Sequence, residues 1–475
     1  MNVVFSSETF LFLFLPLFLA AYYLTPLRFR SITILIGSYA FYAWWRIDFL
    51  GLLVLTTLWT FAFGRLITAA KSAKAAKTFL VIGLTGCLAV LGVFKYLNFF
   101  IDSFATLWGT DAADLGVHWR LILPIGVSFY VFQAVSYLVD VYRKDADAAT
   151  NFFDFAAFIA LFPQLIAGPI LRFKDLAGQF AHREHSIDLF VQGMTIFFIG
   201  LAKKVLLADT VAPLANLAFQ TPDPSLVLSW VGSIAYMIQL YFDFSGYSDM
   251  AIGIGLMLGF HFIHNFDTPY ISRSITEFWR RWHISLSVWL RDYLYVPLGG
   301  NRHGVKRTYL NLMLVMVLGG LWHGANWTFV LWGLWHGTWL AVERATGRAK
   351  GADAGALVST LFIVLLGWVM FRATTVAEAL GVYRGMLGLN GLGMSPDMAV
   401  AITAEGLLFL MIGIAVTAAE PRLNQLAATR LQVGADDRLT TLNAVVPSVL
   451  MVGLSTFTIM KLAEQSFSPF LYFQF

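Results

Sequence analysis

Stretches of about 20 mostly apolar residues, the length that an α-helix needs to cross a lipid bilayer, recur from one end of this 475-residue chain to the other. Hydrophobic residues make up 58% of the chain and charged residues only 13%, so a water-soluble surface cannot cover this much apolar material. Inside a bilayer the backbone must satisfy its own hydrogen bonds, and apolar runs of this length do so as helices. The sequence therefore predicts an all-α polytopic membrane protein.

We expect roughly eleven to thirteen membrane segments, some of them re-entrant. The candidate segments are residues 8–25, 31–45, 49–70, 78–100, 121–141, 188–208, 226–242, 308–329, 329–345, 355–371, 404–418 and 443–461. Basic residues follow the first, third and fifth segments, whereas the intervening connection 101–120 carries three aspartates. Because basic connections stay in the cytoplasm, we expect the N-terminus on the periplasmic side of the inner membrane.

The run from Leu161 to Arg172 holds two prolines and a glycine within apolar sequence. An unbroken helix in lipid would leave backbone groups without partners there, so we expect a broken or re-entrant element that is buried in protein. No repeat or long linker divides the chain, which we therefore interpret as one transmembrane domain, residues 1–475, with its core motifs at about 120–345. The net charge of +4, without a clustered basic face, does not suit nucleic-acid binding.

The segment from Thr276 to Arg302 concentrates four arginines, three tryptophans and a histidine in an otherwise apolar chain. Charge at this density near a membrane usually has a function. At helical spacing, residues 276–291 separate an aromatic face from a face with Arg280, Arg281 and Arg291, and His283 lies at the boundary. One interpretation is an interfacial anchor; the other is a basic wall for an anionic ligand, with His283 turned inward.

A second motif, Gly319–Trp327, places His323 at the end of an apolar run, between Trp322 and the nearby Asn326. A neutral imidazole in such a setting is suited to proton transfer, and the flanking glycines allow a close approach of backbone or substrate. A hydrogen-bonded core histidine is the competing interpretation. The presence of His283 in a second polar motif favours the functional one.

A third motif, Gln239–Asp249, contains Asp243 and Asp249 in apolar surroundings. Buried carboxylates must be paired or protonated, and we expect an arginine or histidine of the 276–291 segment as the partner. A structural ion pair and a catalytic role both fit. His261 and His264 lack a suitably spaced carboxylate, so no metal site is expected, and no phosphate-binding Gly-x-x-x-x-Gly-Lys loop is present.

Taken together, these motifs resemble the membrane-bound O-acyltransferase superfamily, and most closely its bacterial alginate O-acetyltransferases. The motifs that carry the resemblance are Val4–Ser7, Phe41–Trp45, Leu123–Tyr130, Leu165–Pro169, Tyr241–Met250, Phe278–Arg302, Leu321–Asn326 and Phe470–Phe475. They extend over nearly the whole chain. The resemblance implies a multi-helix membrane fold with a central funnel or tunnel, and it assigns the family's catalytic histidine to His323 and a second characteristic histidine to His283.

The resemblance also implies a chemistry and partners. Acetyl-CoA would be the acyl donor, entering from the cytoplasm, with no bound cofactor, and His323 would be the general base. Arg280, Arg281 and Arg291 can bind the phosphates of coenzyme A or pair with Asp243 and Asp249, and His283, Asn326 or a backbone N–H can stabilise the oxyanion. A periplasmic SGNH-hydrolase-like transferase, together with other polysaccharide-modification proteins, would receive the acetyl group for an exported polymer, expected to be alginate.

Two other interpretations remain open. Within the same fold, the acceptor polymer can be cellulose, peptidoglycan or, with D-alanine as the acyl group, teichoic acid. A membrane transporter would also use broken helices and buried charges, but it predicts inverted repeats, which are not seen, and gives no reason for the His323 motif.

Overall fold

The computed structural model describes residues 4–347, 354–432, 439–464 and 470–471, and the regular secondary structure of this part of the chain is entirely helical, with no strand. The first helices are α1 (Leu15–Leu24), α2 (Arg30–Trp45), α3 (Ile47–Ala69), α4 (Ala73–Leu91), α5 (Leu97–Leu107) and α6 (Val127–Arg143). The middle helices are α7 (Phe152–Ala160), α8 (Phe162–Leu165), α9 (Phe173–Ala181), α10 (Ile187–Ala202), α11 (Asp209–Gln220) and α12 (Leu226–Met257).

The remaining helices are α13 (Ile275–Arg281), α14 (Ile284–Leu290), α15 (Gly304–His323), α16 (Trp327–Thr346), α17 (Ala354–Arg372), α18 (Val376–Met386), α19 (Pro396–Ala401), α20 (Ala404–Gln432) and α21 (Leu439–Glu464). Single π-helical turns interrupt several of them: η1 (Phe10–Phe14), η3 (Gly92–Tyr96), η4 (Lys203–Ala208) and η6 (Arg291–Tyr295). Short 3₁₀ turns are η2 (Leu27–Phe29) and η5 (Pro269–Ile271). The predicted all-α fold is confirmed.

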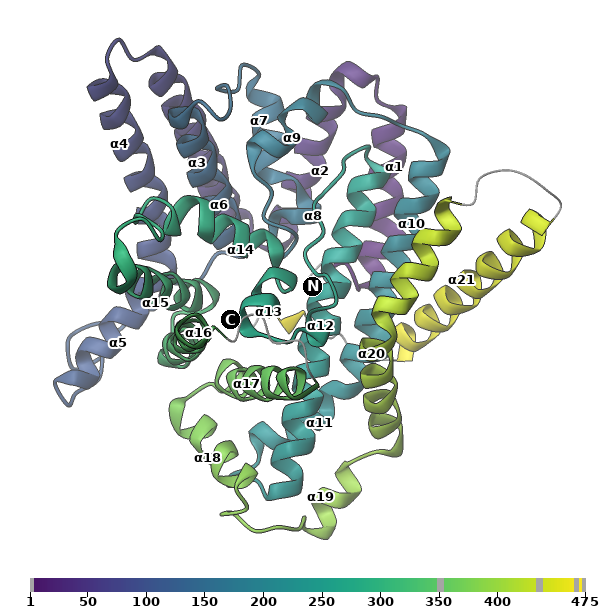
Figure 1. The fold of residues 1–475 in the computed structure, drawn as a ribbon. Helices are drawn as coiled ribbons and strands as arrows, with labels where there is room; N and C mark the ends of the chain where they lie inside the picture. Colours follow the sequence, from purple (N-terminus) through teal and green to yellow (C-terminus); the bar gives the residue numbers. More distant parts are fainter. Residues whose placement is uncertain (1–3, 348–353, 433–438, 465–469, 472–475) are drawn as a thin grey trace.

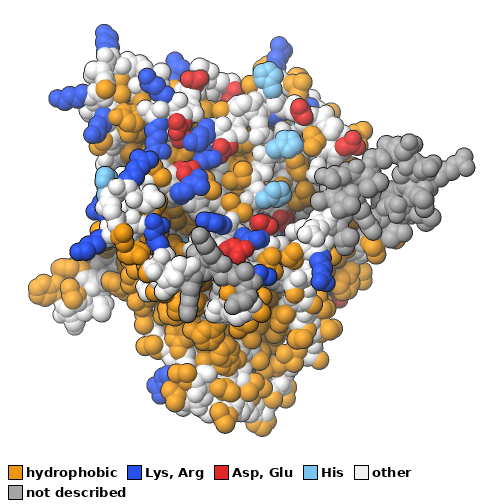
Figure 2. Space-filling model, in the orientation of Figure 1, with side chains coloured by type: hydrophobic (Ala, Val, Ile, Leu, Met, Phe, Trp, Pro, Cys, Tyr) orange, Lys and Arg blue, Asp and Glu red, His pale blue; other side chains and the backbone are white. Residues whose placement is uncertain are grey.

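Within the described residues, six helical stretches are long and apolar enough to cross a membrane. They are residues 47–69, 73–107, 187–220, 226–257, 354–372 and 404–425. Other predicted segments are helical but are shorter, less apolar or enclosed by protein, as in α6, where most residues are buried. In Figure 1 the α1–α2 and α3–α4 connections lie at one edge of the molecule, and Figure 2 shows basic side chains on that half and a hydrophobic surface below.

The long helix α12 crosses the middle of the molecule and packs against α10 and α11 (Figure 1). Two pairs of glycines allow α10 and α12 to approach closely: a Cβ on Gly200 would lie 2.5 Å from the carbonyl oxygen of Gly246, and one on Gly253 would lie 2.5 Å from that of Gly193. Small residues at a helix crossing are a common means of packing helices in membranes. Gly246 of the 239–249 motif is therefore a packing residue.

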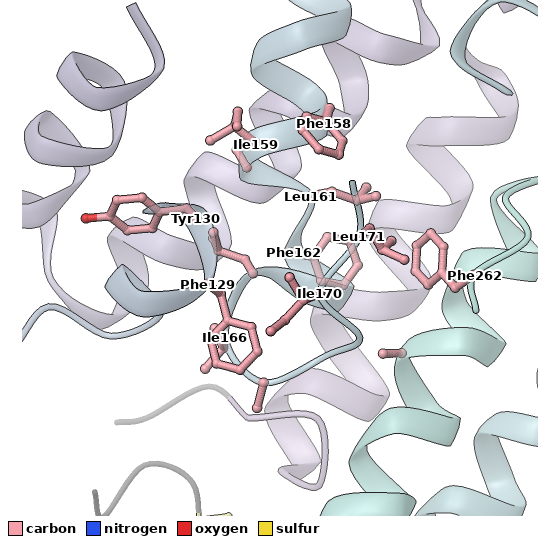
Figure 3. Packing of buried hydrophobic residues seen from close by; sticks show 14 of the residues in the cluster. Phe129, Tyr130, Phe158, Ile159, Leu161, Phe162, Ile166, Ile170, Leu171 and Phe262 are labelled. Carbon is pink, nitrogen blue, oxygen red and sulfur yellow. The ribbon is translucent and has the colours of Figure 1, made fainter. Parts of the chain in front are cut away.

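The run from Leu161 to Arg172 is broken, as predicted from its prolines. Helix α7 ends at Ala160, the short α8 follows, and an irregular buried segment continues to Arg172. Figure 3 shows how Leu161, Phe162, Ile166, Ile170 and Leu171 pack into a dense apolar cluster with Phe129 of α6. Protein, rather than lipid, therefore surrounds this irregular backbone, which agrees with the rule that such segments occur at membrane depth only when they are enclosed.

Candidate active site

His323 is the last residue of α15 and is 5% exposed. Its ring lies against the rings of Trp332 and Phe371, at centroid distances of 5.4 and 5.2 Å. Helix α15 reaches this position by packing closely on α16, where a Cβ on Gly320 would lie only 2.2 Å from the carbonyl oxygen of Phe329. Gly320 therefore serves helix packing, whereas the neighbouring Gly319 lines a groove that leads to His323.

The end of α15 is held by two side chains from the π-helical turn η3. The Lys95 ammonium donates to the Ser128 hydroxyl at 3.0 Å, to the His323 carbonyl at 3.3 Å and to the Trp322 carbonyl. The Tyr96 hydroxyl donates to the Leu321 carbonyl at 3.0 Å. A cation at the C-terminus of a helix satisfies free carbonyls and interacts favourably with the helix dipole. Lys95 therefore fixes the backbone that carries His323.

His283 lies between α13 and α14 and is fully buried. Its backbone is left-handed, with φ 44° and ψ 55°, a conformation that costs a non-glycine residue roughly 1–2 kcal/mol and often marks a functional site. The ring Nδ1 lies 3.2 Å from Oδ1 of Asn265. The ring centroids of His283 and His323 are 6.2 Å apart, so the fold brings together the two histidines that the sequence singled out.

The single amphipathic helix predicted for residues 276–291 is wrong. The segment is two short helices, because the left-handed His283 turns the chain between them. Two backbone hydrogen bonds from another segment stabilise the break: Ile284 donates to the Asn265 carbonyl and Asp267 donates to the Arg281 carbonyl, both at 2.9 Å. The aromatic face is nevertheless largely buried, with Phe278, Trp282 and Trp289 in the core.

The three arginines differ in their partners. Arg281 forms ion pairs with Glu277 at 3.0 Å and with Asp267 at 3.4 Å. Arg291 is exposed and pairs with Asp292 at 2.7 Å. Arg280 is exposed and forms no ion pair with any described residue.

Asp292 is the acidic centre of this basic region. Its partial burial favours the neutral form, but the hydrogen bond and charge of Arg291, together with the charge of Arg172, hold the pKa of Asp292 below its usual value. Arg143, in the basic connection after α6, donates to the Asp292 carbonyl at 3.1 Å. The Arg291 region therefore lies on the same side of the molecule as that basic connection.

The expectation that Asp243 and Asp249 pair with the 276–291 segment is wrong. Lys204, which is 1% exposed, bridges Asp243 and Asp209, each at 2.7 Å, and Lys203 pairs with Asp249 at 2.9 Å. The other carboxylate oxygen of Asp243 accepts the backbone N–H of Leu471 at 3.0 Å. Both oxygens of Asp243 are thus engaged within the fold, which favours the structural interpretation of this aspartate and leaves the arginines free of it.

Asn326 and Trp322 have well-defined packing roles. The Asn326 carbonyl oxygen caps α16 by accepting from the N–H of Thr328 at 3.1 Å, and its amide donates to the Thr374 carbonyl at 2.8 Å. The Trp322 ring is buried against Phe132 and lies 5.1 Å from the His323 ring. Any contact of either residue with a reacting group stays a prediction.

Two cavities approach the end of α15, and they differ in chemistry. The first, which we call the apolar groove, has a volume of about 260 Å³ and is lined mainly by Leu, Val, Met and Trp side chains of α13–α16, with Arg291 at one end and His323 at the other. The second, which we call the polar cavity because polar side chains take a larger share of its lining, has a volume of about 810 Å³. It is lined by Lys95, Asn98, Asp102, Ser103 and Thr106, by the apolar Phe99, Leu107 and Leu123, and by residues 325–327. Lys95 connects them, since it lines the cavity and bonds the His323 carbonyl.

The residues that line the two cavities extend toward different sides of the molecule. The helical stretch 73–107 begins at the basic α3–α4 connection and is about 50 Å long, so its last turns, which line the polar cavity, lie far from the basic edge. Arg291, at the end of the apolar groove, contacts the basic connection after α6 through Asp292. Within the described residues no group of three or more His, Cys, Asp or Glu side chains could hold a metal ion.

Sequence reasoning missed four polar residues that organise this region: Lys95, Lys203, Lys204 and Asn265. The three lysines lie inside apolar runs, where a charge requires a partner or a function, and this was a signal that could have been used. All three belong to π-helical turns, which occur frequently at functional sites. Asn265 gave no such signal, because its importance comes from a contact with a residue 18 positions away.

Comparison with known proteins identifies the family. The model of the membrane-bound O-acyltransferase family matches residues 115–350. The "Probable alginate O-acetylase AlgI" of Azotobacter vinelandii is 48% identical, and the match covers all of both chains. The "Peptidoglycan O-acetyltransferase" of Helicobacter pylori is 38% identical over 82% of this chain and 81% of its own. The "Teichoic acid D-alanyltransferase" of Streptococcus thermophilus is 30% identical over 48% of this chain and 58% of its own.

A full-length relative at this identity leaves no doubt about membership, and the helical membrane fold and the matched histidine motifs agree with it. The chain is thus a multi-pass membrane acyltransferase that belongs to the membrane-bound O-acyltransferase family.

Proposed function

We propose that this chain transfers acetyl groups from cytoplasmic acetyl-CoA, across the inner membrane and through a partner protein, for the O-acetylation of exported alginate. The observation that carries the proposal is the position of His323. Its side chain lines the narrow apolar groove, and its backbone carbonyl accepts a hydrogen bond from Lys95, which lines the wider and more polar cavity. An enzyme that joins a donor and an acceptor from two compartments needs this arrangement.

The apolar groove suits the donor. A volume of about 260 Å³ with an almost wholly apolar lining accommodates a thin acyl-pantetheine arm and excludes a sugar. Arg291 lies at the groove's outer end, and Arg280 follows Trp279, another groove residue. Since neither arginine pairs with Asp243 or Asp249, both remain suited to the phosphates of coenzyme A.

The polar cavity suits the acceptor. The hydroxyls of Ser103 and Thr106 offer hydrogen-bonding groups for a hydroxyl-bearing molecule, whereas the Asn98 amide is bonded to the backbone of Leu121. The residues that line the cavity lie far from the basic α3–α4 connection. With the basic connections in the cytoplasm, the cavity faces the periplasm and the N-terminus is also periplasmic. A periplasmic SGNH-hydrolase-like transferase would then receive the acetyl group and place it on the polymer.

The chemistry requires one base and one acyl donor. A ring nitrogen of His323 takes the proton of the acceptor hydroxyl, and the oxygen attacks the thioester carbonyl carbon. The tetrahedral intermediate collapses with cleavage of the C–S bond, and the coenzyme A thiolate takes up the proton from the imidazolium. The products are an acetyl ester and free coenzyme A, so atoms and charges balance.

Alginate is proposed because the relatives named as alginate O-acetylases match over their full length. The Helicobacter pylori relative makes peptidoglycan the second candidate acceptor polymer. The D-alanyl alternative has weaker support, since the relatives with that name match less than half of this chain.

The experiment is an acetyl-transfer assay in membranes that contain this chain, with labelled acetyl-CoA, the SGNH-like partner, and either alginate or peptidoglycan fragments. We expect label on alginate only when both proteins are present. Label on peptidoglycan instead would show that peptidoglycan, and not alginate, is the acceptor polymer. Transfer from a D-alanyl carrier but not from acetyl-CoA would overturn the proposal that acetyl-CoA is the acyl donor.

A further inference from the structure

We infer that Asn265 is a positioning residue that fixes the tautomer of His283, so that its Nε2 atom is a hydrogen-bond acceptor and not a donor. The inference deepens the proposed function, on which it rests for the role of the site. It concerns the 265–285 region, where three buried polar side chains, Asn265, His283 and Ser285, share one set of hydrogen bonds.

The orientation of the Asn265 amide follows from a backbone group. The N–H of Ser285, which can only donate, lies 3.2 Å from Oδ1 of Asn265. That position must therefore hold the oxygen of the amide and not its nitrogen. The nitrogen of the Asn265 amide is consistent with this orientation, since Nδ2 donates to the Ser248 hydroxyl at 3.2 Å.

The single proton of the Ser285 hydroxyl is also accounted for. Its oxygen accepts the backbone N–H of Ile170 at 3.0 Å, and the hydroxyl donates to Oδ1 of Asn265 at 2.9 Å. Ser285 therefore has no proton to give to the His283 ring, whose Nδ1 is 3.4 Å from its hydroxyl oxygen. Ile170 belongs to the broken segment, which thus helps to orient the site.

The tautomer of His283 follows. Nδ1 lies 3.2 Å from Oδ1 of Asn265, an atom that can only accept, so Nδ1 carries the proton of the neutral ring. Nε2 then presents a lone pair. Nε2 is buried and forms no hydrogen bond with any described residue. The centroid of the His283 ring lies 6.2 Å from that of the His323 ring. A buried acceptor in this position is matched by a hydroxyl, the group that the acceptor substrate brings.

The consequence for the reaction is a division of roles. In its resting tautomer His283 accepts a hydrogen bond from the acceptor hydroxyl and orients it, and it has no N–H at Nε2 to stabilise an oxyanion. The oxyanion therefore requires another donor. Rotation of the ring would exchange the two nitrogens, but the ring is fully buried and packs edge-to-face against the Phe244 ring at a centroid distance of 4.7 Å, which restricts this rotation.

The test combines ¹⁵N NMR of histidine-labelled protein with steady-state kinetics, in the full chain. The His283 signals are assigned by their loss in His283→Gln. We expect a ring protonated at Nδ1 in the wild type, and a mixed or reversed tautomer in Asn265→Ala with kcat lowered by about 10- to 100-fold and an unchanged KM for acetyl-CoA.

Two further variants separate positioning from folding. Asn265→Asp keeps an acceptor oxygen opposite Nδ1 and should restore both the tautomer and most of kcat. Ser248→Ala removes only the contact at the far end of the amide and should leave the tautomer unchanged. A wild-type ring protonated at Nε2, or an Asn265→Ala protein with unchanged tautomer, would overturn the inference. Because the NMR signal needs no turnover, this result is independent of whether the proposed donor and polymer are correct.

Discussion

The apolar groove and the polar cavity both approach the end of α15 but differ in almost every other property. The groove is narrow, is lined by aliphatic and aromatic side chains, and has Arg291 at its outer end. The cavity is about three times larger, and its lining combines hydroxyl, amide and charged side chains with apolar ones. Under the proposed function, this difference would separate the two substrates by chemistry as well as by compartment. They would meet at the end of α15, where Lys95 holds the backbone that carries His323.

Blocking the groove is expected to have the largest effect. Val315→Trp fills the groove, so we expect loss of acetyl-CoA binding and a fall in transfer of at least about 100-fold, because the donor can no longer be positioned at His323. The matched control is Leu314→Trp, one residue earlier on α15, whose side chain is partly exposed and does not line the groove. Binding is measured by calorimetry with purified protein. Normal acetyl-CoA binding by Val315→Trp would show that the apolar groove is not the donor site.

Removing the hydrogen bonds from Lys95 to the end of α15 is expected to have the next largest effect. Lys95→Met keeps much of the side-chain volume but leaves the Trp322 and His323 carbonyls without their donor, at about 1–3 kcal/mol for each buried group. We expect lower thermal stability and kcat reduced by about 10- to 100-fold, with little change in KM for either substrate. Lys74→Met, at an exposed lysine of the same helix, is the control. Wild-type kcat in Lys95→Met would show that the hydrogen bonds of Lys95 do not position His323.

Narrowing the cavity tests the acceptor side. Ser103→Trp places a bulky ring in the polar cavity, whereas Phe104→Trp changes the next residue, which faces outward and is exposed. We expect Ser103→Trp to lower transfer to the acceptor about tenfold while acetyl-CoA binding stays normal. The informative comparison is between acetyl-CoA binding by Ser103→Trp and by Val315→Trp. If both variants lose acetyl-CoA binding, the two cavities do not serve different substrates.

The smallest effect is expected at the groove's outer end. Arg280→Gln and Arg291→Gln remove exposed charges, and we expect each to raise KM for acetyl-CoA by about threefold at low salt, with kcat unchanged and with the difference reduced at high salt. Assays at two ionic strengths measure this, with Lys74→Gln as the control. A change in kcat that is insensitive to salt would contradict phosphate binding.

Much of the architecture was predictable, because it depends on local pattern. Apolar length predicted the helices, and the prolines between Leu161 and Arg172 predicted the break that Figure 3 shows buried. The family was identified from long motifs and is confirmed. Helix α12 extends to Met257, well past the predicted residue 242, because Lys203 and Lys204 neutralise the carboxylates that made residues 243–249 look unfavourable.

What the sequence could not predict depends on contacts between distant segments. The break at His283 requires backbone bonds from Asn265 and Asp267, and a helical pattern in residues 276–291 gives no sign of them. The partner of Asp243 is a lysine 39 residues earlier, chosen by the packing of α10 against α12. The catalytic assignments of His323 and His283 stay predictions, although the fold places their rings close together.

The central claim is that His323 performs acyl transfer where the two cavities meet. The direct measurement is acetyl transfer from labelled acetyl-CoA by purified, folded protein in the presence of its partner, for wild type, His323→Ala and His303→Ala, an exposed histidine at the other end of α15. The account predicts that His323→Ala still binds acetyl-CoA but loses transfer by at least about 100-fold, and that His303→Ala remains active. Wild-type transfer by His323→Ala would contradict the claim and move the base to His283.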